Sequence, residues 1–592
     1  MTRTQPPANP ATAVATVLVD ELVRCGVRDL VLAPGSRSAP LAFAAHAAAE
    51  SGRVRLHVRV DERSAGFLAL GIARTSRRPV PVMTTSGTAV ANLHPALLEA
   101  AHAGLPLVVL SADRPAGLRG TNANQTTDQV KLFGDAVRAF ADVPPGAAGP
   151  GEPAQVASWR SLVARTLLTA RGDAGRAPGP VHLNVQLAEP LTPDVDGGWT
   201  APVDGRPDGA PWTVGPDRRR PQPEPVSASL RTVVVAGDDA GPPARLLAER
   251  AAWPLLAEPT SGSRTGANAI RTYRLLLGDP ALADRIEQVV VFGHPTLSRP
   301  VTRLLSREDV EIVAVPGPTG WTDPGHRVTR VVDAAHPDDQ APDAGRWVAD
   351  SGEPRPAKPS SSWLREWQQR DRELADRLDA YLDAQSGLTP HHVAAAVSAA
   401  VPPDGLLFVG ASNPVRDLDL TAVPYPVGER RLVVANRGLA GIDGSVSSAV
   451  GAALGRDRTS RALALLGDLT FLHDANGLLL GAARDAHPRP GRLVPDLMIV
   501  VVNDDGGSIF SVLEQGGPQH AASFERLFGT PQGVDLGALC AASGTPHRRV
   551  TSREELAAAL DSPRGGVEVV EAAVRRDDRR EVDAAIRELV SK

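Results

Sequence analysis

Short apolar runs rich in valine and leucine alternate along the chain with alanine-rich stretches whose apolar positions recur at helical spacing. An apolar run that ends abruptly in a polar turn is typical of a buried parallel strand. Repetition of strand, turn and helix predicts parallel sheets covered by helices on both faces. The runs fall into three groups, at 27–33, 80–83, 107–110 and 181–185; at 232–235, 289–292 and 310–315; and at 406–409, 432–434, 463–466, 497–502 and 567–570.

Stretches rich in proline, glycine and aspartate separate the three groups, as interdomain linkers do. The chain has 592 residues, too many for one core. We therefore predict an α/β protein with three consecutive doubly wound parallel-sheet domains. Because residues 363–382 are dense in charge at helical spacing, they predict a solvent-exposed connecting helix. The predicted parts are a first domain at 1–195, a linker at 196–230, a central domain at 231–345, a linker with the connecting helix at 346–385, and a third domain at 386–592.

Composition excludes several classes of protein. The formal net charge of −5 provides no field that would favour nucleic acid or an anionic membrane. Cys25 and Cys540 are the only cysteines, so no disulfide framework or structural zinc site is expected, which fits a cytoplasmic location. No apolar run approaches the ~20 residues that span a bilayer, so we expect no stable membrane insertion.

Hard oxygen ligands follow two neighbouring apolar runs of the third group. The run at 463–466 ends in Gly467 and Asp468, and the run at 497–502 ends in Asn503, Asp504, Asp505, Gly506 and Gly507. Carboxylates beside glycines at one sheet edge could hold Mg²⁺ and a diphosphate. Each motif alone is more often an ordinary structural turn than a ligand site, because Asp, Asn and Gly dominate turns. The ordered pair favours a metal and diphosphate site.

Three common signatures are missing from the strand ends. They are G-x-G-x-x-G for dinucleotides, G-x-x-x-x-G-K-[ST] for nucleoside triphosphates, and G-x-S-x-G for serine hydrolases. The sequence therefore does not favour nicotinamide, ATP or serine-hydrolase chemistry.

Long motifs in both outer regions resemble those of thiamine diphosphate enzymes. GDLTFLHDANGL at 467–478 and VVNDDGGSIFS at 501–511 resemble the diphosphate-binding signature of that superfamily. The residues of both motifs are similar to those of the 2-succinyl-5-enolpyruvyl-6-hydroxy-3-cyclohexene-1-carboxylate synthase family of menaquinone biosynthesis. So are APGSRSAPL at 33–41, DERSAGFLALG at 61–71, TSGTAVAN at 85–92, ADRPAGLRGTNANQ at 112–125, GASNPVRD at 410–417 and NRGLAGIDG at 436–444. Over the central region the resemblance is weak.

The resemblance implies a transferase, specifically a carboligase, that uses thiamine diphosphate with Mg²⁺ or Mn²⁺. It would decarboxylate 2-oxoglutarate and add the resulting succinyl carbanion equivalent to isochorismate in a 1,4 sense. The first domain would bind the pyrimidine ring and the third the diphosphate, in a homodimer or homotetramer with active sites at the dimer interface. One alternative is another thiamine diphosphate carboligase or 2-oxo acid decarboxylase, and a second is a non-catalytic metabolite-binding protein.

The resemblance also implies roles for particular residues. Asp468, Asp504 and the Gly506 carbonyl would hold the metal, although the superfamily usually has asparagine where Asp504 stands. Glu62 would exchange a proton with the aminopyrimidine ring; the alternative is an acid that merely begins a helix. Ile442 would hold the cofactor in its bent conformation. The implied cofactor-binding set is Glu62, Ser86, Gly87, Ser412, Ile442, Gly467, Asp468, Leu469, Gly506, Gly507, Ile509 and Phe510.

The implied substrates are anions, and arginine pairs bidentately with carboxylate. Ser412 and Arg416 would bind the distal carboxylate of 2-oxoglutarate, with Arg437 nearby. A solvated side chain is the alternative for any single arginine in so arginine-rich a chain. The residues implied for isochorismate are Ser36, Arg37, Arg114, Asn124 and Gln125, and on a looser match Arg299.

Overall fold

The computed structural model describes residues 8–147, 149–173, 175–217, 221–339, 361–456, 461–481 and 493–591. Residues 218–220 and 346–360 of the predicted linkers lie outside this part of the chain. The chain divides into two compact units. Unit 1 comprises Met1–Arg218, Gly438–Asp457 and His473–Pro495, and unit 2 comprises Arg219–Arg437, Arg458–Leu472 and Asp496–Lys592.

Unit 1 contains a six-stranded sheet with the strand order β2-β1-β3-β4-β6-β5. All of its strand pairs are parallel. The four inner strands match the predicted apolar runs, whereas the two edge strands were not predicted because they are only partly buried and carry polar residues. The bounds are β1 (Asp29–Leu32), β2 (Arg55–Val58), β3 (Val80–Thr84), β4 (Leu107–Asp113), β5 (Phe140–Val143) and β6 (Val181–Gln186).

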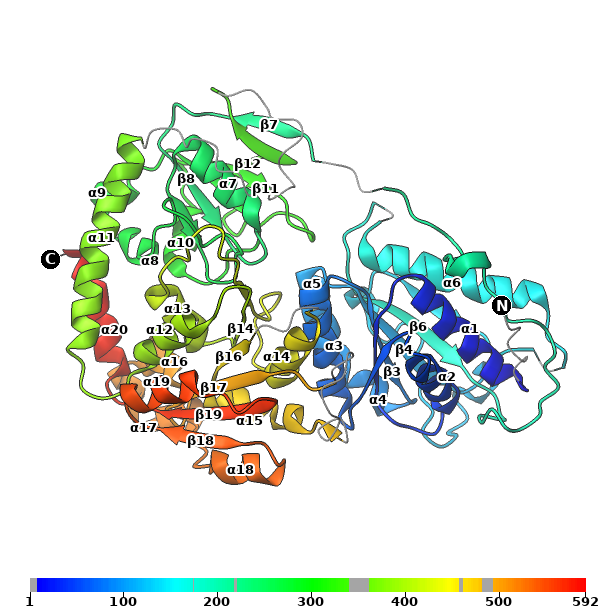
Figure 1. Ribbon diagram of the computed structural model, residues 1–592. Helices are drawn as coiled ribbons and strands as arrows, with labels where there is room; N and C mark the ends of the chain where they lie inside the picture. The colour runs from blue at the N-terminus through cyan, green and yellow to red at the C-terminus, as the bar shows by residue number, and fades with distance from the viewer. Residues whose placement is uncertain are drawn as a thin grey trace. The chain divides into compact units, whose positions relative to one another are not determined.

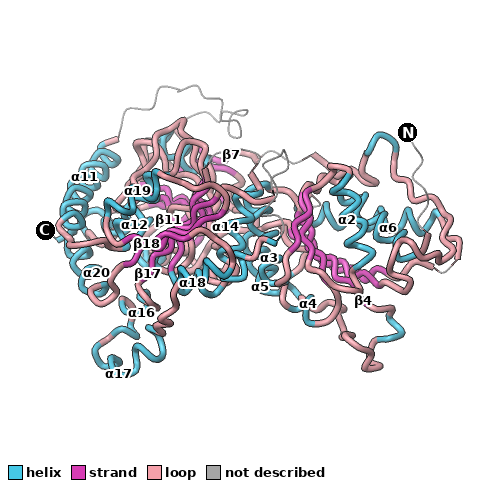
Figure 2. The backbone as a smooth tube through the Cα atoms, turned by 60° about the horizontal axis from the view of Figure 1, so that its bottom comes forward, coloured by secondary structure: helices cyan, strands magenta, loops and turns pink. Residues whose placement is uncertain are grey.

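Helices cover both faces of this sheet. One face packs against α1 (Pro10–Arg24), α2 (Ala39–Glu50) and α6 (Pro153–Arg171), and α3 (Glu62–Ser76) and α5 (His94–Ala103) lie on the other (Figure 1). Figure 2 shows the same order of layers from another direction. The short helix α4 (Thr88–Ala91) follows β3.

Two glycines allow α3 to pack closely along α14 (Ser445–Leu454). A Cβ on Gly71 of α3 would overlap the Ser448 carbonyl, and one on Gly451 of α14 would overlap the Leu68 carbonyl. Only glycine permits such a close backbone approach.

Unit 2 contains two larger parallel sheets and a two-stranded one. Their orders are β12-β11-β10-β8-β9, β15-β14-β16-β17-β19-β18 and β13-β7, and every pair is parallel. The bounds are β7 (Pro223–Val226), β8 (Thr232–Ala236), β9 (Leu255–Ala257), β10 (Gln288–Phe292), β11 (Glu311–Val315), β12 (Val328–Val331), β13 (Ala334–Pro337), β14 (Leu406–Val409), β15 (Leu432–Val434), β16 (Ala462–Gly467), β17 (Leu497–Asn503), β18 (His547–Val550) and β19 (Val567–Ala573).

The parallel α/β architecture predicted from the sequence is therefore confirmed. All the predicted apolar runs of the central and third groups are strands. The larger sheets fall within the ranges predicted for the three domains, and the boundaries themselves stay a prediction.

The five-stranded sheet packs against α7 (Pro242–Ala251) on one face and against α8 (Tyr273–Leu276), α10 (Arg299–Leu304) and α11 (Ser362–Asp383) on the other. Helices α12 (Pro390–Ala400), α13 (Asn413–Thr421) and α19 (Arg553–Asp561) pack against the six-stranded sheet of unit 2. The remaining α-helices are α9 (Pro280–Ala283), α15 (Asp468–His473), α16 (Ser508–Ser511), α17 (Ala521–Phe524), α18 (Leu536–Ala542) and α20 (Arg579–Glu588). None of the described helices has the length and apolar character needed to cross a bilayer.

The connecting helix α11 exists, but the prediction that it is solvent-exposed was wrong. Trp363, Trp367, Leu374 and Leu378 lie on one face of the helix and are buried in the core of unit 2. The charged residues occupy the remaining surface, so the helix is amphipathic. Its many charged residues favoured a prediction of exposure, although a minority of apolar residues at helical spacing is enough to bury one face.

Candidate active site

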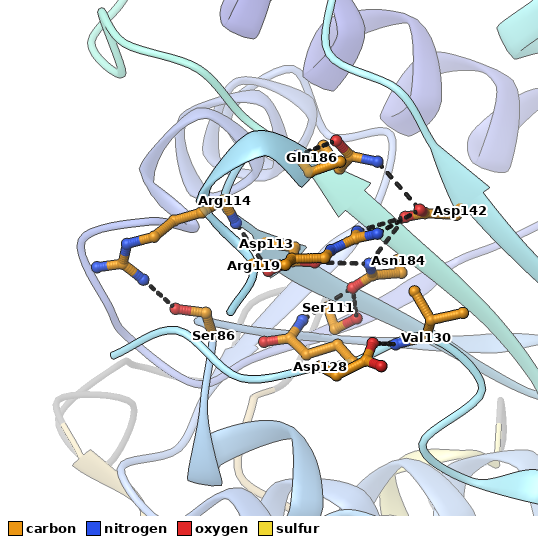
Figure 3. A network of polar contacts seen from close by, with 12 residues as sticks. Ser86, Ser111, Asp113, Arg114, Arg119, Asp128, Val130, Asp142, Asn184 and Gln186 are labelled. Atoms are coloured by element: carbon orange, nitrogen blue, oxygen red, sulfur yellow. Dashed lines mark hydrogen bonds and ion pairs between the residues drawn. The ribbon is translucent and has the colours of Figure 1, made fainter. Parts of the chain in front are cut away.

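Three of the residues predicted to bind ligands meet at the carboxyl edge of the unit 1 sheet. The Ser86 hydroxyl donates to the Gln125 carbonyl (2.8 Å), and the Gln125 side-chain amide donates to the Ser86 carbonyl (2.9 Å). Arg114 Nη1 donates to Ser86 Oγ (2.8 Å) and to the Gln125 carbonyl (2.6 Å). The loops after β3 and β4 are thereby joined, and Figure 3 shows Arg114 reaching Ser86.

A polar network beneath these loops holds the second loop in place (Figure 3). Arg119 donates to both carboxylate oxygens of Asp142 (2.9 and 3.0 Å) and to Asp113 (2.9 Å). The Asn184 amide donates to the same two carboxylates. Burial alone would raise the pKa of Asp142, but the hydrogen bonds from Arg119 and Asn184 hold that pKa below its usual value. Arg119 lies in the sequence motif at 112–125, but no role was predicted for it.

Arg37 lies beside Arg114. Its Nη1 donates to the Leu187 carbonyl (3.0 Å), and its ion pair with the exposed Glu189 is long (3.5 Å). Burial and the charge of Arg114 lower the pKa of Arg37. Ser36 and Asn124 are exposed on the same loops. This edge therefore carries a local excess of positive charge suited to a carboxylate ligand.

Glu62 is the first residue of α3 and is half-buried. The helix is capped by its neighbour, because Asp61 Oδ1 accepts the Ser64 N–H (3.2 Å). No residue in the described ranges donates a hydrogen bond to the Glu62 side chain. Asp61 is thus the N-cap of α3, so capping the helix does not require Glu62. The Glu62 carboxylate remains available for a ligand.

The loop before α14 carries Ile442 and is fixed at both ends. Glu99 of α5 accepts the N–H groups of Gly438 and Leu439, each at 2.7 Å. At the other end Gly444 has φ +59°, and a Cβ there would overlap the Phe67 ring. Ile442 is half-buried between these anchors. The role of Glu99 was missed, because nothing local in the sequence connects it to a loop about 340 residues away.

In unit 2 the two predicted metal-binding turns come together at the carboxyl ends of β16 and β17, which pair in parallel. The buried Asp468 accepts the Gly506 N–H at 2.8 Å. Gly506 has φ +149°, and a Cβ there would overlap Arg576 and the Gly529 carbonyl. Glycine is therefore required at this position.

The electrostatics of these turns fit a divalent cation. Burial, followed by the charge of Asp504, raises the pKa of Asp468 to about 7. Burial raises the pKa of Asp504 to about 6, opposed by a hydrogen bond from Ser508. A cation between the two carboxylates would relieve both effects. Among the described residues no group of three or more His, Cys, Asp or Glu could hold a metal.

The other predicted cofactor residues flank these turns. Gly467 ends β16 and Leu469 lies in the first turn of α15. Gly507 donates its N–H to the Gly529 carbonyl (2.7 Å). Ile509 and Phe510 follow on α16 and are half-buried.

Two predicted substrate arginines lie near each other in unit 2, Arg437 buried and Arg416 half-buried. Arg416 on α13 donates to the Ser412 carbonyl (2.6 Å), and Arg437, which is 4% exposed, donates to Thr296 Oγ1 (2.8 Å). Burial lowers the pKa of Arg416, and the charge of Arg437 lowers it further. Neither guanidinium forms an ion pair with a carboxylate of the described residues. A carboxylate ligand would compensate both charges.

Arg299 differs from the other predicted substrate residues. It begins α10 on the surface and pairs bidentately with Glu514 (2.8 and 3.2 Å). Its guanidinium therefore already has a carboxylate partner, and its assignment to isochorismate stays a prediction.

Comparison with known proteins adds whole-chain similarity to this geometry. Residues 12–132 match the family described as thiamine pyrophosphate enzyme, N-terminal TPP binding domain. A curated protein of Nocardioides sp., named 2-succinyl-5-enolpyruvyl-6-hydroxy-3-cyclohexene-1-carboxylate synthase, is 56% identical over 592 residues, which is 100% of both chains. Proteins of the same name from Kineococcus radiotolerans and Saccharopolyspora erythraea are 51% and 48% identical, covering 98% and 97% of this chain and 100% and 97% of theirs.

Proposed function

Because the chain belongs to the 2-succinyl-5-enolpyruvyl-6-hydroxy-3-cyclohexene-1-carboxylate synthase family, we propose that it decarboxylates 2-oxoglutarate with thiamine diphosphate and adds the resulting succinyl carbanion equivalent to isochorismate. The 1,4-addition gives 2-succinyl-5-enolpyruvyl-6-hydroxy-3-cyclohexene-1-carboxylate and CO₂, in menaquinone biosynthesis. The observation that carries this proposal is identity of 56% over the full length of both chains.

Asp468, Asp504 and the Gly506 carbonyl hold Mg²⁺ or Mn²⁺ against the cofactor diphosphate. The raised pKa values of the two carboxylates support this assignment, because each carboxylate is buried without a neighbouring charge that fully compensates it. The flanking residues Ser412, Gly467, Leu469, Gly507, Ile509 and Phe510 contact the cofactor.

Thiamine diphosphate, when bound, supplies the carbanion-stabilising chemistry. Glu62 holds and exchanges a proton at a nitrogen of the aminopyrimidine ring, which requires a carboxylate free of other hydrogen bonds. Ser86 and Gly87 line the same ring, and Ile442 supports the bent cofactor on its anchored loop. No residue in the described part of the chain donates a hydrogen bond to the Glu62 side chain, which supports this role.

Different arginines bind the two substrates. Arg416, with Ser412 and the nearby Arg437, binds the distal carboxylate of 2-oxoglutarate. The unit 1 edge formed by Ser36, Arg37, Arg114, Asn124 and Gln125 binds isochorismate, and Arg299 is a weaker candidate because Glu514 already pairs with it. Support comes from the lowered pKa values of Arg37 and Arg416, which burial and the charges of the neighbouring arginines Arg114 and Arg437 cause.

The protein acts as a homodimer or homotetramer, with active sites at the interface of two copies. The first domain (1–195) binds the pyrimidine part of the cofactor and the third (386–592) its diphosphate. We place the protein in the cytoplasm, which its two buried, unpaired cysteines support.

One assay separates this proposal from its alternatives. The purified protein is incubated with Mg²⁺, thiamine diphosphate and 2-oxoglutarate, with and without isochorismate, and substrate loss is followed by absorbance and product by mass. We expect product only when both substrates are present, and almost none with Glu62→Gln. Release of CO₂ at the same rate without isochorismate would indicate a simple 2-oxo acid decarboxylase, and no turnover of either substrate would indicate a binding protein.

A further inference from the structure

The turn that follows β10 of the five-stranded sheet contacts one of the two substrate arginines directly. Thr296, in the turn that follows β10, accepts a hydrogen bond from Arg437 Nη2 at 2.8 Å. The Thr296 side chain is exposed, whereas Arg437 is 4% exposed. The hydroxyl therefore fixes a guanidinium whose other donors are left for a ligand.

The turn that carries Thr296 is held rigidly against the end of β8. Asp238 and His294 exchange backbone hydrogen bonds of 3.1 and 3.0 Å. A Cβ on Gly237 would overlap Pro295, and Gly293 has φ +66° with the Asp238 carbonyl close by. The turn consequently has little freedom to move Thr296 away from Arg437.

Glu258, directly after β9, holds the same turn through a hydrogen bond to its backbone. It is 2% exposed, and its Oε1 accepts the Leu297 N–H at 2.9 Å. Its Oε2 has no hydrogen-bond partner among the described residues. Burial raises the pKa of Glu258 to about 8, while the Leu297 N–H and the Arg437 guanidinium oppose the shift. Glu258 thus holds the residue next to Thr296 and adds a carboxyl group to the surroundings of Arg437.

The second arginine is held from the same region. Arg274 of α8 donates to the Arg416 carbonyl (3.1 Å). Asp419, three residues further along α13, accepts from the Tyr273 hydroxyl (2.8 Å) and from Arg264 (3.3 Å). Arg416 and Arg437 repel each other, so their separation needs such external support.

We propose that Thr296 and Glu258 are positioning residues that hold the Arg437 guanidinium beside Arg416, and that the central sheet thereby sets the affinity for the distal carboxylate of the 2-oxo acid substrate. The inference rests on the proposed function, because that function assigns Arg416 and Arg437 to this carboxylate. It gives the central sheet a role in substrate binding.

The test uses two substitutions at one exposed position. Thr296→Val removes the hydroxyl and keeps the shape, and Thr296→Ser keeps the hydroxyl. A hydrogen bond to a charged group is lost only in the first, so we expect KM for 2-oxoglutarate to rise about tenfold in Thr296→Val. Thr296→Ser should stay within about twofold of the wild type, and KM for isochorismate should not change in either variant.

Glu258→Ala removes the group that accepts the Leu297 N–H, whereas Glu258→Gln keeps an acceptor there, and with a pKa of about 8 Glu258 is already mostly uncharged at neutral pH. We expect a rise of severalfold in KM for 2-oxoglutarate with a smaller change in kcat in Glu258→Ala, and a clearly smaller rise in Glu258→Gln. Glu249→Gln is the matched control: Glu249 lies on α7 of the same region, where it pairs with Arg245, and its substitution should leave KM unchanged.

Unchanged KM in Thr296→Val, or equal impairment of Thr296→Val and Thr296→Ser, would overturn the inference. Failure of the proposed function would look different, because the wild type itself would not turn over 2-oxoglutarate. In that case calorimetric titration of 2-oxoglutarate decides: weaker binding by Thr296→Val than by wild type supports the positioning role, and equal or absent binding overturns it.

Discussion

The affinity of the metal-free protein for a divalent cation should depend steeply on pH. Asp468 has a pKa of about 7 and Asp504 one of about 6 in the absence of metal, and a cation binds the ionised forms. At pH 8 both carboxylates are ionised. At pH 5.5 the cation must displace the proton of Asp468, which costs about 2 kcal/mol at 1.36 kcal/mol per pH unit, and a smaller cost comes from Asp504.

We therefore expect the Kd for Mn²⁺ to rise by about 30-fold or more between pH 8 and pH 5.5. Electron paramagnetic resonance of free Mn²⁺ gives this Kd without thiamine diphosphate, whose phosphate groups titrate in the same range. The stability of the metal-free protein should change with pH in the opposite direction to its affinity for the cation. Because both folded-state pKa values are raised, the metal-free folded protein binds protons more tightly than the unfolded chain, and these groups reduce stability as pH rises from about 4 to 7.

Asp504→Asn provides the control for this prediction. Removing the charge of Asp504 should lower the pKa of Asp468, so the Kd of the variant should vary less with pH than that of the wild type. A Kd that is independent of pH in the wild-type protein would refute the reasoning, as would equal pH profiles for the two proteins.

Three further substitutions test other parts of the site. Glu62→Gln should lower kcat by at least about 100-fold, because a proton-transfer group is lost, with little change in Tm by calorimetry; near-wild-type turnover would contradict the role of Glu62. Gly506→Ala should abolish measurable Mn²⁺ binding, because its φ of +149° and the neighbouring Gly529 carbonyl exclude a side chain, and retained binding would argue against the turn geometry. Arg119→Ala should cost about 3 kcal/mol in urea unfolding, because Asp113 and Asp142 lose a shared partner; a loss below about 1 kcal/mol would show that the network is dispensable.

The inner strands could be predicted from the sequence because they are buried on both faces and read as unbroken apolar runs. Five strands of the larger sheets were missed: β2, β5, β9, β12 and β18, and all of them lie at sheet edges. Four of these are partly exposed and carry polar or charged residues, and β9 is buried but has only three residues. An edge strand needs no continuous apolar run, so periodicity does not reveal it.

The candidate site shows the same limit. Asp468 and Gly506 could be predicted because each follows an apolar run and the parallel sheet brings the two run ends together. Glu99 and Glu258 could not, because each is a single buried acid that holds backbone N–H groups distant in sequence. Such contacts depend on the tertiary fold and leave no local pattern.

The most direct test of the central claim is the stoichiometry of the reaction with 2-oxoglutarate labelled at its carboxyl carbon C1. We predict one labelled CO₂ for each isochorismate consumed, and one unlabelled product whose mass equals that of both substrates less CO₂. Labelled CO₂ formed without consumption of isochorismate, or a product of any other mass, would contradict the account.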